Sequence, residues 1–268
     1  MNRGSQIGDY IVEREVSRSQ TEIVLEAVHV TLDRAVTIKL MAPARAQLRG
    51  ADAKLVREAQ LLDNLRHAGI ARIYDCGILD DGRKWYATDR LPASTLANLI
   101  AGGARMDVAY VLLALAAIIE HAHERGIAHR SLRADHIACA ADARGYTLFV
   151  DHWSDARDLG PIDAATDVHA LGVIAYQTLT GMMPFAAPTV AMMLTRTSVT
   201  SLCPRAPRAV TALIDRMLAA DPMSRPSLTE VRLEAARIIA GVTPAITRAI
   251  RAIEHDDEAT RFDIALAG

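Results

Sequence analysis

The residues best able to do chemistry fall into two groups that lie far apart in the chain. Residues 129–137 read HRSLRADHI, and Asp151 follows shortly after, so histidines and carboxylates gather there. At the centre of this stretch stands Ser131, whose hydroxyl has no useful basicity near neutral pH. In the second group, Lys39 ends an apolar run and Glu58 follows within the next helical pattern. A buried ammonium requires a fixed carboxylate beside it, which favours a Lys39–Glu58 pair; separately, each would extend its charge into water.

Composition excludes several classes of function. Lys and Arg number 30 against 32 Asp and Glu, so no broad basic surface is available for nucleic acid. The longest apolar run, 108–119, is shorter than the ~20 residues that a membrane span needs, and the N-terminus lacks an apolar signal core. The three cysteines are odd in number and lack metal-type spacing, which is typical of reduced thiols. We therefore expect a cytoplasmic protein without a membrane partner.

The elements that position these residues change in type along the chain. Short β-branched runs at 10–12, 23–25 and 36–38 predict strands, and residues 51–65 have helical spacing of apolar positions. Strand character returns at 70–74 and 85–91, whereas the sequence after 108 is mainly helical, with short strand signals at 137–139 and 148–150. Strands followed by helices predict an α+β fold with a small sheet lobe and a larger helical lobe.

Several ordered motifs resemble those of the eukaryotic-type (bacterial Hanks-type) Ser/Thr protein kinases. The stretch at 129–136 is similar to their H-R-D-L-x-x-x-N loop. Further matches are VTIK at 36–39, REA at 57–59, HAGI at 67–70, the hinge-like WYATDRL at 85–91, DVHALGV at 167–173, GMMPF at 181–185 and DPMSRP at 221–226. The resemblance implies one bilobal kinase-like domain over 1–268, with an N-lobe and hinge at 7–91, a C-lobe at 92–240, and a helix with an acidic tail at 241–268.

The resemblance also assigns roles to four residues. Lys39 would contact nucleotide phosphates, and Glu58 would orient that lysine. Thr88 falls at the position beside the hinge known as the gatekeeper, and Asp151 at that of the metal-binding aspartate. The nucleotide that the family uses is ATP with Mg²⁺ or Mn²⁺, although a purely binding role requires no cofactor.

Other positions depart from the family pattern. Ser131 replaces the catalytic base Asp, and His136 replaces an Asn that holds a second Mg²⁺, a hard ion that prefers oxygen. Ser17, Ser19 and Glu22 stand where the glycine-rich phosphate loop has its three glycines. These substitutions predict the loss of phosphoryl transfer.

The segment after Asp151 is much shortened. Asp-Phe-Gly has become Asp-His-Trp, and the chain reaches Asp167 without an A-P-E motif or room for a peptide-docking platform. Arg225, which in the family pairs with the A-P-E glutamate, is predicted to pair instead with Asp163 or Asp158. Arg130, which in many kinases binds an activation-loop phosphate, has no such phosphate to bind.

Two predictions concern the centre of the molecule. An apolar column linking the lobes, anchored by Asp167 at its base, is predicted from four positions: Leu62, Ile73, His152 and His129. A less favoured hypothesis brings three side chains together on a transition metal in place of Mg²⁺: His136, His152 and Asp151.

The C-terminal tail carries a candidate modification site. Thr260 lies in an acidic segment that resembles those phosphorylated by bacterial Ser/Thr kinases and bound by forkhead-associated domains. A phosphate there would add about −1.5 to −2 charge and three acceptors for an arginine-lined pocket. The alternative is a solvated acidic terminus with no such role.

Three functions remain open from the sequence. The favoured one is a pseudokinase, a non-catalytic scaffold or regulatory binding module in bacterial Ser/Thr-phosphorylation signalling, with a forkhead-associated domain or an active kinase as its partner. The second is a divergent ATP-dependent transferase that uses Lys39, Glu58 and Asp151. The third is a sensor that binds a metabolite smaller than ATP between the lobes. The sequence does not indicate an oligomeric state, nor whether Arg18 and Arg133 form a new anion site.

Overall fold

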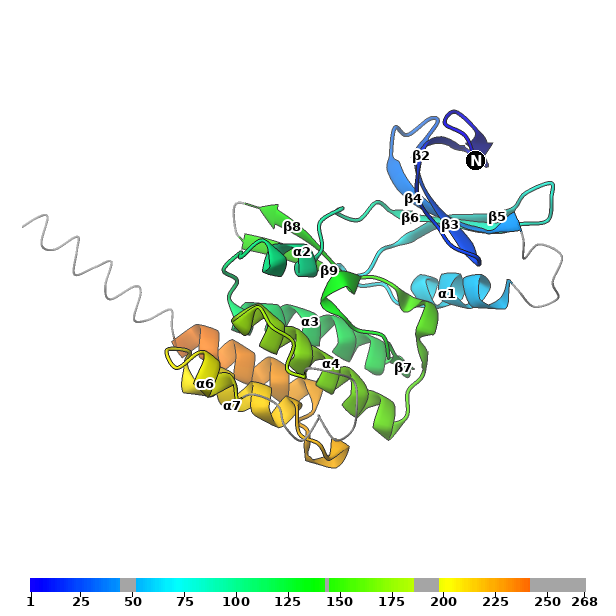
Figure 1. Cartoon of the computed structure of the whole chain (residues 1–268). Helices are drawn as coiled ribbons and strands as arrows, with labels where there is room; N and C mark the ends of the chain where they lie inside the picture. Colours follow the sequence, from blue (N-terminus) through cyan, green and yellow to red (C-terminus); the bar gives the residue numbers. More distant parts are fainter. Residues whose placement is uncertain (44–51, 143–144, 186–197, 242–268) are drawn as a thin grey trace, which may run out of the picture.

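A six-stranded antiparallel sheet and one helix form the smaller of two lobes in the computed structural model (Figure 1). The structure describes residues 1–43, 52–142, 145–185 and 198–241. Neighbouring strands follow the order β1-β2-β3-β4-β6-β5. The strands are β1 (Gln6–Ile7), β2 (Tyr10–Arg18), β3 (Glu22–His29), β4 (Ala35–Met41), β5 (Ile73–Ile78) and β6 (Lys84–Asp89). The helix α1 (Ala53–Asn64) lies between this sheet and the larger lobe (Figure 1).

Strict alternation along β3 and β4 separates the core of the sheet from the face that lines the site. Val24 pairs with Lys39 and Glu26 with Thr37, so these four side chains share one face. The intervening positions are fully or almost fully buried and form the core of the lobe together with Trp85: Ile23, Leu25, Ala27, Val36, Ile38 and Leu40. The pattern of the sequence therefore places a lysine and a glutamate on the inner face of a well-packed sheet.

The larger lobe is mainly helical, as the sequence predicts. Its helices are α2 (Leu96–Ala101), α3 (Val108–His123), α4 (Pro161–Thr180), α6 (Val199–Leu202), α7 (Arg208–Met217) and a last helix over 228–241. Short strands complete it: β7 (Ile127–Ala128), β8 (Ile137–Asp142), β9 (Gly145–Val150) and β10 (Arg157–Asp158). The predicted α+β, bilobal fold is confirmed. No helix in the described ranges is both long enough and apolar enough to cross a bilayer.

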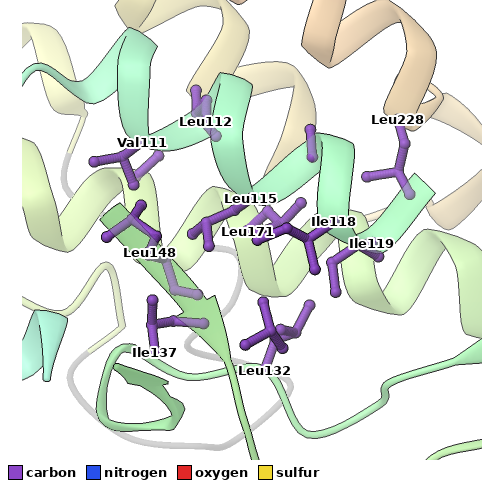
Figure 2. Packing of buried hydrophobic residues seen from close by; sticks show 14 of the residues in the cluster. Val111, Leu112, Leu115, Ile118, Ile119, Leu132, Ile137, Leu148, Leu171 and Leu228 are labelled. Carbon is purple, nitrogen blue, oxygen red and sulfur yellow. The ribbon is translucent and has the colours of Figure 1, made fainter. Parts of the chain in front are cut away.

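The helix α3 is the centre of the larger lobe. Asp107 caps its N-terminus by accepting a hydrogen bond from the Ala109 N–H (2.8 Å). Apolar side chains along it pack against β8, β9, α4 and the last helix (Figure 2). The chain before β5 approaches α3 so closely that a Cβ on Gly69 would lie 2.3 Å from the end of the Ile118 side chain, so any larger residue there would have to displace Ile118.

The strand predicted at 70–74 is the main error in the element assignments. β5 instead begins at Ile73, and the preceding Ile70 forms an isolated bridge with Val150 of β9. Ile70 is buried in the contact between the lobes, so its β-branched side chain reflects tertiary packing rather than membership of a strand.

Candidate functional site

A cleft of about 420 Å³ separates the sheet lobe from the helical lobe. Val24, Thr37 and Lys39 line it from the sheet, Ala138 from β8, and Asp151 from the end of β9. The hinge between β6 and α2 closes one side through three residues in succession: Asp89, Arg90 and Leu91. The structure therefore brings together in one cleft residues from both of the groups that the sequence singles out.

The lysine and glutamate of the sheet lobe form a buried ion pair. Lys39 Nζ lies 2.9 Å from Glu58 Oε1, and the Glu58 side chain is only 1% exposed. Burial by itself would lower the pKa of Lys39, but the Tyr86 phenol and the nearby carboxylates, led by Glu58 and Asp151, outweigh burial and hold that pKa well above its usual range. Lys39 is therefore a permanent cation whose charge is already balanced by the protein.

Asp151 faces this lysine from the helical lobe. Burial opposes its ionisation, but Lys39 and then His152 outweigh that effect and lower the pKa of Asp151 below its usual value. Its backbone carbonyl accepts a hydrogen bond from His129 Nε2 at 2.9 Å. The carboxylate is thus ionised at neutral pH and fixed at the floor of the cleft, where it offers one hard oxygen ligand.

The turn between β2 and β3 binds three of its own backbone N–H groups. The Ser19 hydroxyl accepts hydrogen bonds from the N–H groups of Thr21 (3.1 Å) and Glu22 (3.0 Å), and the Ser19 N–H donates to the Glu22 carbonyl (2.8 Å). Glu22 also places its carboxylate in the lining of the cleft. A phosphate-binding loop needs free N–H groups directed at the anion, and at this turn the N–H groups of Ser19, Thr21 and Glu22 are already bonded.

A charged cluster at the mouth of the cleft was missed by the sequence analysis. Glu26 is only 7% exposed and binds the guanidinium groups of both Arg14 and Arg90. Arg90 also bonds to Glu13 at 3.0 Å, which links the hinge to β2. The signal that could have revealed this cluster is the period of two, because Glu26 lies two residues after Val24 on the face of the sheet that also carries Lys39.

The loop at 129–137 shows no base at the position of Ser131. The Ser131 carbonyl accepts a hydrogen bond from His136 Nδ1 at 2.6 Å, so His136 has its Nδ1 occupied. Burial, and then the neighbouring His152, lower the pKa of His136, which keeps its ring neutral. Asp135 is bound through both carboxylate oxygens by Arg133, at 2.9 Å each.

The sequence leaves open whether Arg18 and Arg133 form a new anion site, and their partners in the structure bear on that question. Arg18 bonds to Glu15 through two nitrogens, as Arg133 does to Asp135. Each guanidinium is therefore already neutralised by a neighbouring carboxylate, which disfavours an anion site built from them.

The column that links the lobes contains Trp153 rather than His152, and this corrects the prediction. His152 has a left-handed backbone (φ 63°), which turns its side chain, 53% exposed, toward the cleft. There it stacks on His136 with ring centroids 4.2 Å apart. Trp153 is instead 1% exposed, meets the His129 ring edge-on at 4.5 Å, and donates from Nε1 to the Val150 carbonyl. An aromatic side chain therefore still fills the core, displaced by one residue.

The transition-metal hypothesis is not supported. Within the described ranges, no group of three or more His, Cys, Asp or Glu side chains could hold a metal ion. His136 and His152 stack face to face, and His136 Nδ1 is committed to the Ser131 carbonyl. A second Mg²⁺ would also lack the oxygen ligand of an Asn at position 136, so this floor does not fit a two-metal triphosphate.

The shortened segment after Asp151 leads directly into α4. Its strand β10 pairs with β7, and only two residues separate the end of β10 from the start of α4. Arg130 pairs with Asp163 in the first turn of α4 (Nε to Oδ1, 3.1 Å), where many kinases hold a phosphate. The predicted partner of Arg225 was wrong: Arg225 donates to the carbonyls of Ala165 and Ala219 instead.

The remaining predicted site residues are Thr88 and Thr260. Thr88 lines the cleft and is buried, and its hydroxyl donates to the carbonyls of Asp89 (3.3 Å) and Thr37 (3.4 Å). Thr260 lies outside the described residues, as does the rest of the chain after 241.

Comparisons with known proteins agree with this architecture. No family model matches the chain. The chain is 24% identical to the serine/threonine-protein kinase PknJ of Mycobacterium tuberculosis, over 84% of this chain and 44% of PknJ. It is 26% identical to PrkC of Bacillus subtilis (81% and 38%) and 24% identical to a probable serine/threonine-protein kinase of Clostridium acetobutylicum (67% and 31%). The chain thus spans less than half the length of each of these relatives.

Proposed function

The chain belongs to the family of Hanks-type Ser/Thr protein kinases, and from this premise we propose that it is a non-catalytic member, a pseudokinase that acts as a binding module in bacterial Ser/Thr-phosphorylation signalling. The observation that carries the proposal is the state of the loop at 129–137. Ser131 offers no basicity where a proton must be accepted, Asp135 is bound by Arg133, and His136 is bonded to the Ser131 carbonyl. Loss of general base catalysis costs ~10²–10⁴-fold in rate.

The shortened segment supports the same proposal from the side of the substrate. Between Asp151 and α4 the chain has room only for a single turn, Trp153–Asp155, and the short strand β10. A protein substrate has no platform there on which to place a hydroxyl at the cleft. The bilobal surface that remains suits recognition of a partner protein.

A divergent ATP-dependent transferase is the second candidate. The observation in its favour is the ion pair between Lys39 and Glu58, which faces the ionised Asp151. The pair alone does not separate the two functions, because a buried lysine needs a carboxylate whether or not it meets a phosphate.

Incubation of the full chain with labelled ATP and Mg²⁺ or Mn²⁺ tests the proposal. We expect no transfer to the protein itself or to generic substrate proteins. Lys39→Ala and Asp151→Asn are the matched variants. Transfer by the parent protein that either substitution abolishes, with folding retained, would establish the transferase instead.

The partner of the domain is a separate proposal. We propose that an active Ser/Thr kinase phosphorylates Thr260 and that a forkhead-associated domain binds the product, because an acidic segment surrounds that threonine and Asp263 follows three residues later. Phosphorylation by such a kinase and capture by a forkhead-associated domain should be lost in Thr260→Ala and kept in the control Thr247→Ala. Equal modification and binding of both variants would exclude this role of Thr260.

A further inference from the structure

We propose that a pocket outside the cleft binds a phosphoryl group, either of free phosphate or of a phosphorylated side chain on a partner protein. The inference rests on the proposed function, because it names the chemical group that a binding module in phosphorylation signalling would recognise. The pocket measures about 710 Å³ and is lined mainly by residues between the last turn of α1 and the start of β5. It shares only Asp89, at the end of β6, with the lining of the cleft.

Two arginine side chains in the lining of this pocket are available to an anion: Arg66 and Arg72. Arg66 is exposed, and its contacts with Asp63 are long, at 3.4 Å from Nε to the carbonyl oxygen and 3.7 Å from Nη2 to Oδ1. The Arg72 guanidinium has no hydrogen bond or ion pair within the described ranges. Guanidinium groups bind phosphate through paired N–H donors, so two of them suit the several oxygens of a phosphoryl group.

His67 lines the same pocket and offers a ring donor. Its Nδ1 accepts a hydrogen bond from the Gly69 N–H at 2.9 Å, so the ring proton is carried by Nε2. Burial, and then the charge of Arg125, lower the pKa of His67, which keeps the ring in this neutral form at pH 7. His67 Nε2 has no hydrogen-bond acceptor in the part of the chain that the structure describes, so it is free to donate to a ligand.

A second histidine, His121 on α3, has a buried donor without an acceptor. Its ring lies next to that of His67, with the ring centroids 5.0 Å apart. Arg125 Nη1 donates to His121 Nδ1 at 3.1 Å, which places the ring proton on Nε2. His121 Nε2 is buried and has no hydrogen-bond partner within the described ranges. Buried donors are normally bonded, so an acceptor from solution is expected here, and a phosphoryl group bound at His67 can supply it.

Two carboxylates also line the pocket, so its attraction for an anion comes from free donors rather than from net charge. Both oxygens of Asp89 are bonded, Oδ2 to the Arg72 N–H (2.7 Å) and Oδ1 to the Tyr74 hydroxyl. Asp63 is exposed, so water and salt screen its charge. With His67 neutral, two arginines and two aspartates leave the lining without net charge, which suits a single phosphoryl group rather than a polyanion.

NMR of the histidine rings in the full chain tests this inference. The probes are inorganic phosphate and a capped Ala-Ala-Thr-Ala-Ala peptide, with and without phosphate on its threonine. We expect saturable shifts of the His67 and His121 signals with the phosphorylated probes, and none with the unphosphorylated peptide. The control His29 lies on β3 and outside the lining, so its signals should not shift. Tighter binding of the phosphopeptide would identify a phosphorylated protein as the source of the group, and tighter binding of phosphate would identify the free anion.

Two substitutions are expected to weaken the binding of phosphate. Arg72→Met removes a guanidinium and should lower the affinity at least about tenfold. His121→Phe keeps a ring in place but removes the buried donor, and it should lower the affinity about threefold or more. Arg105→Met is the matched control, because Arg105 is exposed between α2 and α3 and does not line the pocket; its affinity should equal that of the parent protein. The melting temperature of each variant without ligand shows whether it is folded.

Two results would overturn the inference: no saturable shift of the His67 and His121 signals with either phosphorylated probe, or a phosphate affinity that Arg72→Met leaves unchanged. The first result would leave water as the acceptor for His121. An equal loss of affinity in Arg105→Met would also overturn it, because phosphate would then respond to surface charge and not to this pocket. Failure here is distinct from failure of the proposed function, which is decided by transfer of labelled phosphate that depends on Lys39.

Discussion

The ion pair between Lys39 and Glu58 has a structural role that does not depend on phosphate chemistry. Glu58 comes from α1 and Lys39 from β4, so their contact at 2.9 Å fixes the helix against the sheet. Both side chains are largely buried, at 13% and 1% exposed. Loss of either partner would leave an uncompensated charge inside the lobe, and this structural requirement is sufficient to retain the pair.

A double-mutant cycle at this pair measures that requirement. Glu58→Gln should lower the free energy of unfolding by ~3–5 kcal/mol, because it leaves the Lys39 ammonium buried without its carboxylate. The double variant Lys39→Met/Glu58→Gln should recover a large part of that loss. Urea unfolding of the parent, both single variants and the double variant gives the coupling. Additive effects within ~0.5 kcal/mol would show that the two side chains do not depend on one another.

Residue types and spacing predicted this pair because the ammonium group of a lysine on the inner face of a buried strand needs a carboxylate beside it. The same reasoning failed at His152 and Trp153. Spacing placed His152 in the column between the lobes, but its left-handed backbone moves the next side chain, Trp153, into the core. The hydrogen bonds of Ser19 could not be predicted either, since they depend on the conformation of a turn and not on residue order.

At the scale of elements, Asp167 joins three parts of the helical lobe. It is fully buried in α4 and accepts hydrogen bonds from the N–H groups of His129 (2.8 Å) and Arg130 (2.7 Å) and from His123 Nε2 on α3 (2.9 Å). One carboxylate therefore holds the loop at 129–137 on the helices. The sequence predicted this anchor by resemblance, whereas the carbonyl partners of Arg225 could be found only from the packing of α4 against 219–225.

Two aspartates of α4 allow a matched comparison. Asp167→Ala should destabilise the protein by about 3 kcal/mol or more, because two buried N–H groups lose their acceptor and a cavity remains. Asp163→Asn should cost about 1 kcal/mol or less, since its partner Arg130 is 38% exposed and pairs of that kind contribute little. Thermal and urea unfolding of the two variants measure the difference. Equal losses would contradict the assignment of Asp167 as the anchor.

At the scale of the whole molecule, several histidines are held neutral. Burial is the largest cause that lowers the pKa of four histidines: His67, His121, His129 and His136. The charge of Arg125 lowers the pKa of His67 and His121 further, and His152 does the same for His136. In the unfolded chain each would titrate near its ordinary value of ~6.5. Below that pH the unfolded chain binds more protons than the folded protein, so stability decreases as pH falls.

The free energy of unfolding should therefore be greatest above about pH 6.5 and should fall between pH 6.5 and 5. Carboxylates with lowered pKa, such as Asp151, lose their contribution only when pH falls below ~4, so the two effects are separated. His136→Asn should reduce the dependence of the free energy of unfolding on pH between pH 6.5 and 5. Urea unfolding at intervals of half a pH unit measures it. A stability that stays constant or rises from pH 6.5 to 5 would refute this account.

Placing the kinase-family residues at positions 131 and 136 should not give the chain protein kinase activity. Ser131→Asp/His136→Asn would return a base and a metal ligand to the floor of the cleft. However, Glu22 and the bonded turn at Ser19 would still oppose a triphosphate, and the segment between Asp151 and α4 would still lack a surface for a peptide. We expect no phosphorylation of a generic peptide or protein by this double variant, measured with labelled ATP and Mg²⁺.

Adding Glu22→Gln and Ser19→Ala should raise ATP binding but still give no peptide phosphorylation, because the missing platform depends on the length of the segment after Asp151 and not on any single side chain. Peptide phosphorylation by either variant would show that residue chemistry alone, rather than the shortened segment, separates this domain from an active kinase.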